Sequence, residues 1–286
     1  MSKKIALMGK IFFGIVCFRE KYWETNSFGD LIKSYNACAN NENLHICIFD
    51  NTDIGDWNIS EIFQVENIGV NVSYTHDNRN SGISIAYNYF AKNALDNGFE
   101  WLVFLDQDTH LPLNFYDIYM RNSSSLDAEN IAFPRVYSGE KLISPSKYIC
   151  YRTKKLNLQN DSKKILLNNI TAINSGLMVK TDFFVNVGGY SNDLRLDFCD
   201  HEFIERLNGQ EIRADLLDVE LEQDFSSDTN DREKALVRYK LYVRDMKIYK
   251  LNKNKLLFLF RVDLAHLLKE SLKNRTFGFL KIRLGL

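Results

Sequence analysis

The chain has 286 residues, 45% hydrophobic and 26% charged, which is enough apolar material for a large core in one main domain plus an appendage. Its net charge of −1 conceals two unlike parts: residues 231–286 contain 15 Lys and Arg against 5 Asp and Glu, a net charge of +10, whereas residues 1–230 contain 21 against 32, a net charge of −11. The five cysteines form no C-x-x-C pair and no stretch reaches about 18 uninterrupted apolar residues, so we expect neither a disulfide framework, a structural zinc site nor a membrane-spanning helix.

The first half of the chain alternates between apolar runs and helical patterns. Polar turns bound five runs that predict strands, at Ile11–Phe18, Leu44–Phe49, Val70–Tyr74, Trp101–Leu105 and Ile131–Val136. Helical spacing predicts a helix over about 27–40 and a second from about 82 to the "DNG" at 96–98. The basic and then apolar N-terminus lacks the small-residue cleavage site of a signal peptide and continues into the first strand. Strands alternating with helices predict an α/β fold with a mostly parallel sheet flanked by helices.

The second half is less regular. Residues 138–168 are polar and weakly periodic, so we expect an excursion or mobile loop there, and the strand pattern returns at Ile170–Val179. After Phe225 the sequence becomes basic and helical through about Ser271. We therefore expect a domain at 1–230 and a basic amphipathic helical extension at 231–286. The cysteines are expected to be buried thiols in a reducing cytosol.

Two carboxylates follow the fourth predicted strand directly, in "EWLVFLDQDTHLP" at 100–112. Ligands of parallel sheets bind beyond the carboxyl ends of the strands, so Asp106, Gln107 and Asp108 fall where a site is expected. Neighbouring carboxylates repel unless a cation compensates, and Mg²⁺ or Mn²⁺ takes one or two carboxylates plus phosphate oxygens and waters. The alternative is a strand-to-loop junction with an Asx turn.

Two neighbouring segments favour the site. Asp50 ends another predicted strand, where an acid can accept a hydrogen bond from a ribose or base. The segment "NRNSG" places Asn78, Arg79, Asn80 and Gly82 at a helix start, whose free N–H groups and guanidinium suit a diphosphate. An ordinary helix cap in this segment is the alternative.

Later motifs make a resemblance specific. The segment "NSGISIAYN" at 80–88, the strand ending in "DQD", the "NSG" at 174–176, "GGY" at 188–190 and "DFCDHEFIER" at 197–206 together resemble inverting glycosyltransferases of family 2 with the GT-A, Rossmann-like fold. The "DQD" and the last motif are most similar to the rhamnosyltransferase-like branch, which builds bacterial surface polysaccharides. The resemblance covers roughly residues 11–226.

The resemblance implies roles residue by residue. Asp50 would contact the nucleoside, Asp106 the ribose or metal-bound water, and Asp108 the metal. Asp200 would be the catalytic base, which takes the proton of the acceptor hydroxyl as it attacks. The adjoining positions and the segment that would line the donor-sugar pocket are Glu202, Arg206, Asn174, Ser175 and Gly176. Without the resemblance, "DFCDHEFIERL" reads as the acidic first turn of a helix.

One position departs from the pattern of the family. Many relatives place a histidine shortly after the base, where it can complete the metal site, and Gln223 stands there in this chain. Glutamine is a weak metal ligand, so the metal is less secure than the donor site. A decayed nucleotide-sugar-binding or scaffold protein therefore remains an alternative. A nucleotidyltransferase would need a basic loop near the first strand, where "FREKYWETNS" is a poor one.

The basic extension suggests a location. Apolar residues interleaved with Lys and Arg can lie on an anionic membrane surface, consistent with a cytoplasmic protein peripheral to the inner face of the membrane and a glycan or lipid-linked acceptor. The alternatives are helices that cover the sheet or form a homo-oligomer contact. Nucleic acid is not expected as a partner, because residues 1–230 are acidic and no RNP-like or zinc-finger motif occurs.

Overall fold

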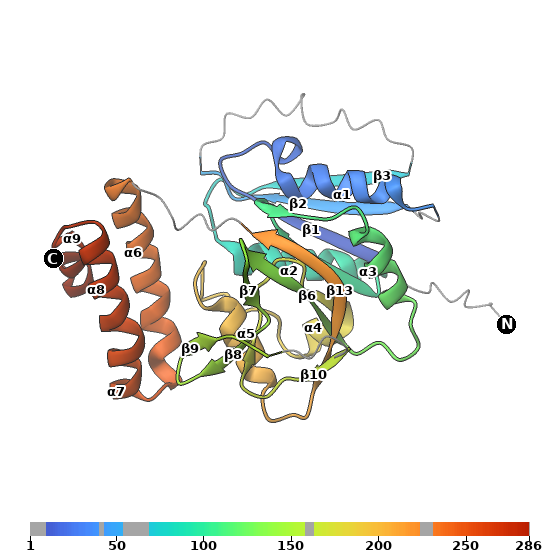
Figure 1. The fold of residues 1–286 in the computed structure, drawn as a ribbon. Helices are drawn as coiled ribbons and strands as arrows, with labels where there is room; N and C mark the ends of the chain where they lie inside the picture. Colours follow the sequence, from blue (N-terminus) through green and yellow to red (C-terminus); the bar gives the residue numbers. More distant parts are fainter. Residues whose placement is uncertain (1–9, 40–42, 54–68, 158–162, 224–230, 286) are drawn as a thin grey trace.

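The computed structural model describes residues 10–39, 43–53, 69–157, 163–223 and 231–285. Within these ranges the chain forms an α/β fold around a mixed, mostly parallel sheet (Figure 1). Its strands run in the spatial order β10-β13-β6-β12-β4-β1-β2-β3, with β5 beside β13 and β7 beside β6. Their bounds are β1 Ile11–Cys17, β2 Leu44–Asp50, β3 Val70–His76, β4 Trp101–Asp106, β5 Thr109–His110, β6 Ile131–Ser138, β7 Lys141–Ser144, β10 Lys164–Leu166, β12 Met178–Lys180 and β13 Arg213–Gln223.

The parallel strands β3, β2, β1 and β4 form one half of the sheet, and β12 enters antiparallel beside β4. Helices cover both faces: α1 and α3 lie on one, and α2, α4 and α5 on the other. Their bounds are α1 Asn26–Ala37, α2 Ile83–Asp96, α3 Phe115–Ser123, α4 Thr181–Asn186 and α5 Cys199–Leu207. The predicted fold class is therefore confirmed, and the five predicted strands lie within two residues of the observed ones.

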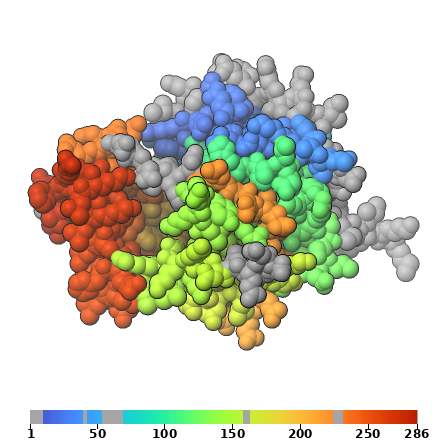
Figure 2. Space-filling model, in the orientation of Figure 1, coloured from blue at the N-terminus to red at the C-terminus, as the bar shows by residue number. Residues whose placement is uncertain are grey.

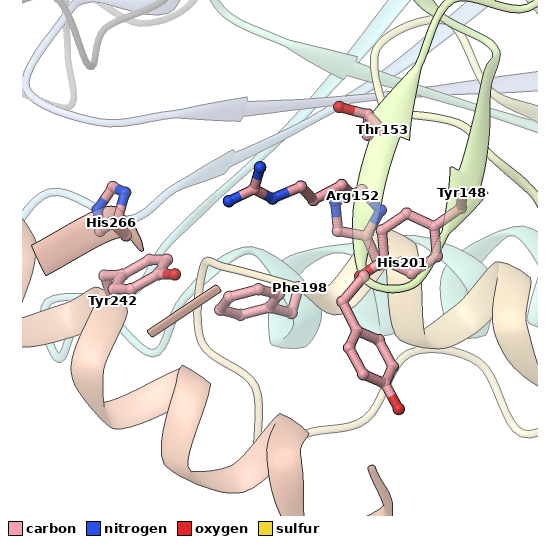
Figure 3. A pocket seen from close by; sticks show the side chains of 8 residues that line it. Tyr148, Arg152, Thr153, Phe198, His201, Tyr242 and His266 are labelled. Carbon is pink, nitrogen blue, oxygen red and sulfur yellow. The ribbon is translucent and has the colours of Figure 1, made fainter. Parts of the chain in front are cut away.

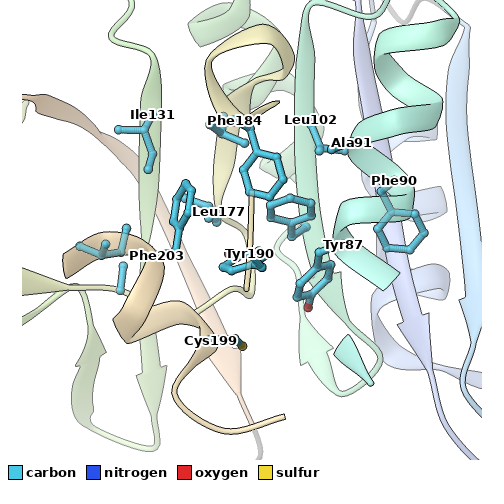
Figure 4. Close-up of a cluster of buried hydrophobic side chains, with 14 of the residues drawn as sticks. Tyr87, Phe90, Ala91, Leu102, Ile131, Leu177, Phe184, Tyr190, Cys199 and Phe203 are labelled. Carbon is cyan, nitrogen blue, oxygen red and sulfur yellow. The ribbon is translucent and has the colours of Figure 1, made fainter. Parts of the chain in front are cut away.

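Strand alternation explains the two cores. On β4, Leu102 and Phe104 face α2, whereas Trp101, Val103 and Leu105 face α1 and α3. Aromatic rings fill the α2 side, as Figure 4 shows, and they include Tyr87, Phe90, Phe184, Tyr190 and Phe203. Burial of each such ring stabilises the fold by about 2 kcal/mol.

Residues 138–168 differ from the prediction of a loop excursion. Short strands occupy much of the segment: β7 and β10 join the main sheet, and β8 (Ser146–Ile149) pairs with β9 (Arg152–Lys154) and β11 (Ile170–Thr171) in a small sheet. Strands this short have no periodicity for a sequence pattern to reveal. The cysteine prediction was also wrong in part, because Cys150, in the β8–β9 turn, is exposed.

The C-terminal helices form one flank of the molecule (Figure 2). They are α6 (Arg232–Tyr249), α7 (Lys255–Phe258), α8 (Leu264–Lys273) and α9 (Gly278–Leu284). Met246, Tyr249 and Phe258 belong to the same hydrophobic cluster as α5, and Asp245 is hydrogen-bonded to the loop before α5. The boundary at residue 230 stays a prediction. Among the helices in the described ranges, none is both long and apolar enough to cross a membrane.

Candidate active site

Four parallel strands, β1 to β4, end at the same level of the sheet. Cys17 of β1 is in register with Asp50 of β2, its neighbour Val16 is in register with Asp106 of β4, and Asp50 is in register with His76 of β3. The structure therefore brings Asp50 and Asp106 to one sheet edge, on either side of β1. This is the edge at which open α/β sheets bind ligands.

The buried Asp50 carboxylate is held by two donors. Its Oδ1 accepts from the Thr52 backbone N–H at 2.9 Å, and its Oδ2 accepts from the Tyr74 hydroxyl at 2.8 Å. The imidazole of His76 lies 2.8 Å from the Thr52 carbonyl. These contacts fix the orientation of the carboxylate expected to contact the nucleoside.

Asp77, which the sequence reasoning missed, organises the loop between β3 and α2. Its carboxylate accepts from the backbone N–H groups of Ser81 at 2.9 Å and Arg79 at 3.2 Å. Burial alone would raise the pKa of Asp77, but the hydrogen bonds from Ser81 and Arg79 lower it to about 2. An aspartate directly after a strand, two residues before a turn, is the sequence signal that could have identified it.

The loop leaves two predicted donor residues facing outward. The Arg79 side chain is 81% exposed, with its Nε 3.2 Å from the Asp77 Oδ1, and Asn78 is exposed; contact of either with a diphosphate stays a prediction. Asn80, at φ 49°, and Gly82, at φ 103°, provide the left-handed turns. A Cβ at Gly82 would lie 2.3 Å from the Arg195 carbonyl oxygen, so only glycine allows this loop to lie against residue 195.

Asp106 is turned inward at the end of β4. Its Oδ1 accepts from the Tyr87 hydroxyl at 2.5 Å and its Oδ2 from the Ser175 hydroxyl at 2.6 Å. Burial raises the pKa of Asp106 despite these hydrogen bonds, and the nearby Asp200 carboxylate raises it further. Ligation of a metal by Asp106 stays a prediction, since each of its oxygens accepts one hydrogen bond and keeps a second lone pair.

Gln107 holds the loop after β1. Its Oε1 accepts from the Phe18 backbone N–H at 2.6 Å, and its Nε2 donates to Glu20 at 2.9 Å. Its side chain thus shapes the site through the 18–20 loop.

Asp108 lies beside the residue that stands in the place of the expected histidine. The Gln223 Nε2 donates to Asp108 Oδ1 at 2.6 Å, and the Gln223 Oε1 accepts from the Thr109 hydroxyl at 2.8 Å. Pairing of β13 with β5 brings the two segments together. Rotation of the Gln223 amide by 180° would direct its oxygen at the same space as Asp108 while its nitrogen donates to Thr109.

The 174–176 segment connects the carboxyl end of β4 to the hydrophobic core. Ser175 is the partner of Asp106, whereas Asn174 points inward and accepts from the Tyr190 hydroxyl at 2.6 Å. Gly176, at φ 78°, turns the chain into β12. A Cβ there would meet Leu221 at 2.6 Å, so the turn requires glycine.

Asp200 lies in the first turn of α5, and its side chain is 19% exposed. Its Oδ1 accepts from the backbone N–H of His201 at 2.7 Å and lies 4.0 Å from the His201 Nδ1. The preceding Phe198 has φ 66°, a left-handed conformation that is uncommon for an aromatic residue. The 174–175 segment links the two carboxylates: the Asn174 Nδ2 lies 3.7 Å from the Sγ of Cys199, which precedes Asp200, and Ser175 donates to Asp106.

Glu202 and Arg206 pair with each other at 2.7 Å, one helical turn apart. The Arg206 guanidinium also donates to the carbonyls of Val187, at 2.6 Å, and Gly189. It therefore fixes the "GGY" turn against α5. Acceptor contact by these two residues stays a prediction.

Asp245 of α6 has no counterpart in the predicted site. Its fully buried Oδ2 accepts from the backbone N–H groups of Arg195, Leu196 and Asp197 at 3.1, 2.7 and 2.9 Å. The same segment touches the donor loop, since the Arg195 carbonyl accepts from the Ile83 N–H at 2.8 Å. The Asp245 carboxylate thus anchors segment 195–197, which lies between the start of α2 and Asp200.

The described residues contain no cluster of three or more His, Cys, Asp or Glu side chains suited to a metal ion. A Mg²⁺ or Mn²⁺ ion coordinated mainly by phosphate oxygens and waters needs only one or two carboxylates. Asp108 fits that requirement, with the Gln223 amide as a possible oxygen donor after rotation.

The strand order, with Asp50 and Asp106 at the carboxyl ends of the parallel strands and Asp200 in the first turn of α5, is that of a GT-A-like fold. Solved structures agree: S. aureus TarS, residues 1–349, gives a TM-score of 0.54 at 11% identity and matches over 95% of this chain and 80% of that one, and it has also been solved with UDP. The structure of GalNAc-T7 with UDP, GalNAc and Mn²⁺ gives a TM-score of 0.56 at 14% identity and matches over 97% of this chain and 56% of that one. The structure of the mannosyltransferase from Pyrobaculum calidifontis with GDP-Man and Mn²⁺ gives a TM-score of 0.53 at 10% identity and matches over 96% of this chain and 73% of that one.

At these identities the likeness establishes the fold. No protein-family model matches the chain, and no curated protein sequence matches it.

Proposed function

We propose that the protein is an inverting glycosyltransferase that moves a sugar from a nucleotide diphosphate donor to a glycan or lipid-linked glycan hydroxyl. The observation that carries the proposal is the position of Asp50 and Asp106 at the carboxyl ends of the parallel strands, with Asp108 two residues further on and Asp200 linked to Asp106 through the 174–175 segment. The sugar we propose is rhamnose, on the resemblance of the motifs, or a hexose such as galactose or glucose.

The chemistry divides between the two sides of the site. Asp50 and the loop at 77–82 bind the nucleoside and the diphosphate, and Arg79 offsets the negative charge of the leaving group. On the other side, the acceptor oxygen attacks the anomeric carbon as the bond from that carbon to the diphosphate oxygen breaks. Asp200 takes the hydroxyl proton. Attack from the face opposite the leaving group inverts the configuration.

For the cofactor we propose Mg²⁺ or Mn²⁺ held by Asp108 and the diphosphate. When bound, it acts as a Lewis acid that stabilises charge on the departing diphosphate. Two of the similar structures were solved with Mn²⁺.

A nucleotide-sugar-binding scaffold is the second candidate. The hydrogen bond from Gln223 to Asp108 favours it, because an amide N–H directed at that carboxylate competes with a cation. The two candidates differ in turnover, since a scaffold binds the donor without transferring the sugar.

A thermal-shift panel of UDP, GDP, dTDP and CDP, each with Mn²⁺, Mg²⁺ or EDTA, tests the proposal. A ligand at 100 times its dissociation constant stabilises the fold by about 2.7 kcal/mol. We expect one diphosphate to give a metal-dependent shift, and hydrolysis or transfer of the matching sugar nucleotide to follow. Folded protein that shifts with none of them would refute the donor site, and binding without turnover would support the scaffold.

We also propose that the C-terminal helices lie on an anionic membrane surface, near a lipid-linked acceptor. Exposed apolar residues at spacings of four or eight lie on α7, on the π-helical turn Leu259–Asp263 and on α8, with exposed fractions of 70% at Leu256, 64% at Phe260, 60% at Leu268 and 75% at Leu272. Residues 231–286 carry a net charge of +10, and each suitably placed Lys or Arg would strengthen binding to an anionic membrane by about 1 kcal/mol.

Vesicle co-sedimentation tests this location. The double variant Phe260→Ser, Leu268→Ser should bind vesicles of phosphatidylglycerol and phosphatidylcholine about 30-fold more weakly, because about 1 kcal/mol is lost for each of the two apolar side chains that no longer insert. Leu126→Ser is the control, because Leu126 is 94% exposed and lies outside the C-terminal helices. Equal binding of both variants would place the contact elsewhere.

A further inference from the structure

A cavity of about 430 Å³ lies between the β8–β9 hairpin, the start of α5 and the C-terminal helices (Figure 3). Its size is that of a small-molecule site. The side chains that line it come from segments far apart in the sequence: Tyr148, Tyr151, Arg152, Thr153, Phe198, His201, Tyr242 and His266.

Flat rings held by other rings dominate the lining. Tyr148 stacks on His201 with centroids 4.7 Å apart and an angle of 13°. Tyr242 contacts Phe198 at 5.3 Å and His266 at 4.1 Å. Rigid aromatic faces combined with a few polar groups suit a ring-shaped ligand whose faces are apolar and whose edges hydrogen-bond, as a pyranose does.

The fixed charge of the lining is positive. The Arg152 Nε donates to the Arg261 carbonyl at 3.0 Å, which directs the guanidinium from β9 toward the C-terminal helices (Figure 3). Burial lowers the pKa of His266, so Arg152 is the permanent cation of the lining. Among the described lining residues there is no carboxylate.

The carboxylates behind this wall are already paired. Three of them form ion pairs with cations other than Arg152, in the pairs Asp197–Arg238, Asp263–Arg283 and Glu205–Lys253. Their charges are therefore largely compensated, and the cavity is left suited to an anion.

The cavity adjoins the proposed base. His201, in the wall, follows Asp200, and the Asp200 Oδ1 lies 4.0 Å from the His201 Nδ1. On its other side, Asp200 follows Cys199, whose Sγ lies 3.7 Å from the Asn174 Nδ2, and the next residue, Ser175, donates to Asp106. Asp200 thus lies between the cavity wall and the carboxyl ends of the parallel strands.

We propose that this cavity is the acceptor subsite and that it takes a pyranoside carrying a phosphate or carboxylate, with the ring against Tyr242 and Phe198 and the anion paired with Arg152. The proposal rests on the proposed function and makes the C-terminal helices part of the acceptor site, since Tyr242 and His266 belong to them. It names the acceptor as anionic.

Ligand-observed NMR titrations test the proposal with four probes: methyl glucoside, methyl glucuronide, glucose 1-phosphate and inorganic phosphate. Each is titrated with and without the nucleoside diphosphate that gives the largest thermal shift. We expect the two anionic sugars to bind about tenfold more tightly than the neutral sugar or phosphate alone, because the anion gains one charge-assisted hydrogen bond from Arg152. Arg152→Gln should remove the preference for the anion, and Tyr242→Leu should weaken all three sugars alike.

Lys147→Gln is the matched control, because it removes one positive charge from the same hairpin outside the lining. The proposal is overturned if neutral and anionic sugars bind equally, if Arg152→Gln binds glucose 1-phosphate as the unaltered protein does, or if no probe binds under either condition. Failure of the proposed function has a different signature, namely no diphosphate binding and no donor turnover.

Discussion

Replacement of Asp245 by alanine should destabilise the protein strongly. Its fully buried Oδ2 accepts three backbone N–H groups, at Arg195, Leu196 and Asp197. Each hydrogen bond to a charged group contributes about 1.5 to 3 kcal/mol, and relief of carboxylate desolvation offsets part of the loss. We expect Asp245→Ala to lower the free energy of unfolding by about 3 to 5 kcal/mol. Asp245→Asn, which keeps one acceptor oxygen, should cost about 1 to 2 kcal/mol.

Urea unfolding measures the free energy, and hydrogen exchange of the peptide covering 190–200 locates the change. The matched control is Asp231→Ala, which removes the N-cap of the same helix and should cost about 1 kcal/mol. Faster exchange at 195–197 in the Asp245 variant alone would confirm the anchor. A loss below about 1 kcal/mol, or unchanged exchange there, would refute this reasoning, because three buried donors cannot lose a charged acceptor at so small a cost.

Three further predictions concern the site. Asp200→Asn should lower turnover by at least ~10²-fold while diphosphate binding, measured by calorimetry, stays nearly unchanged; near-normal turnover would place the base elsewhere. Asp108→Asn should weaken diphosphate binding in Mn²⁺ but not in EDTA, and Gln223→His should strengthen it in Mn²⁺, since imidazole is the better ligand; equal affinities in all three proteins would remove the metal from this position. The low pKa of Asp77 stabilises the fold above about pH 4, and this contribution is lost as the pH falls toward 2, so the stability advantage over Asp77→Asn should shrink by about 1 to 2 kcal/mol across that range in urea titrations; a constant difference would contradict the assignment.

The strand ends were predictable because local patterns determine them. Uninterrupted apolar runs identify the buried parallel strands, and a carboxylate directly after two of the runs marks their ends, which located Asp50 and Asp106. The start of α2 at Ile83, one residue from the predicted one, follows from local spacing in the same way.

Side-chain direction was not predictable, because it depends on distant partners. Asp106 turns inward because the hydroxyls of Tyr87 and Ser175 donate to it. These two residues are 19 and 69 positions away in the sequence, so no local pattern reveals the contact. Asn174 turns toward Tyr190 for the same reason. Asp245 resembles any helix residue until the fold brings residues 195–197 onto it. The short strands at 141–154 are defined by pairing with other segments, β7 with β6 and β8 with β9 and β11, which local patterns do not reveal.

The position of Asp245 late in the chain also bears on synthesis. The segment at 195–197 leaves the ribosome about 50 residues before its anchor, and at 5 to 20 residues per second it waits for several seconds without it. During that interval the strands β1 to β4 have already been synthesised, but segment 195–197, which leads into α5 and Asp200, lacks its buried acceptor. The residue proposed as the base would therefore reach its final position only after α6 has been synthesised.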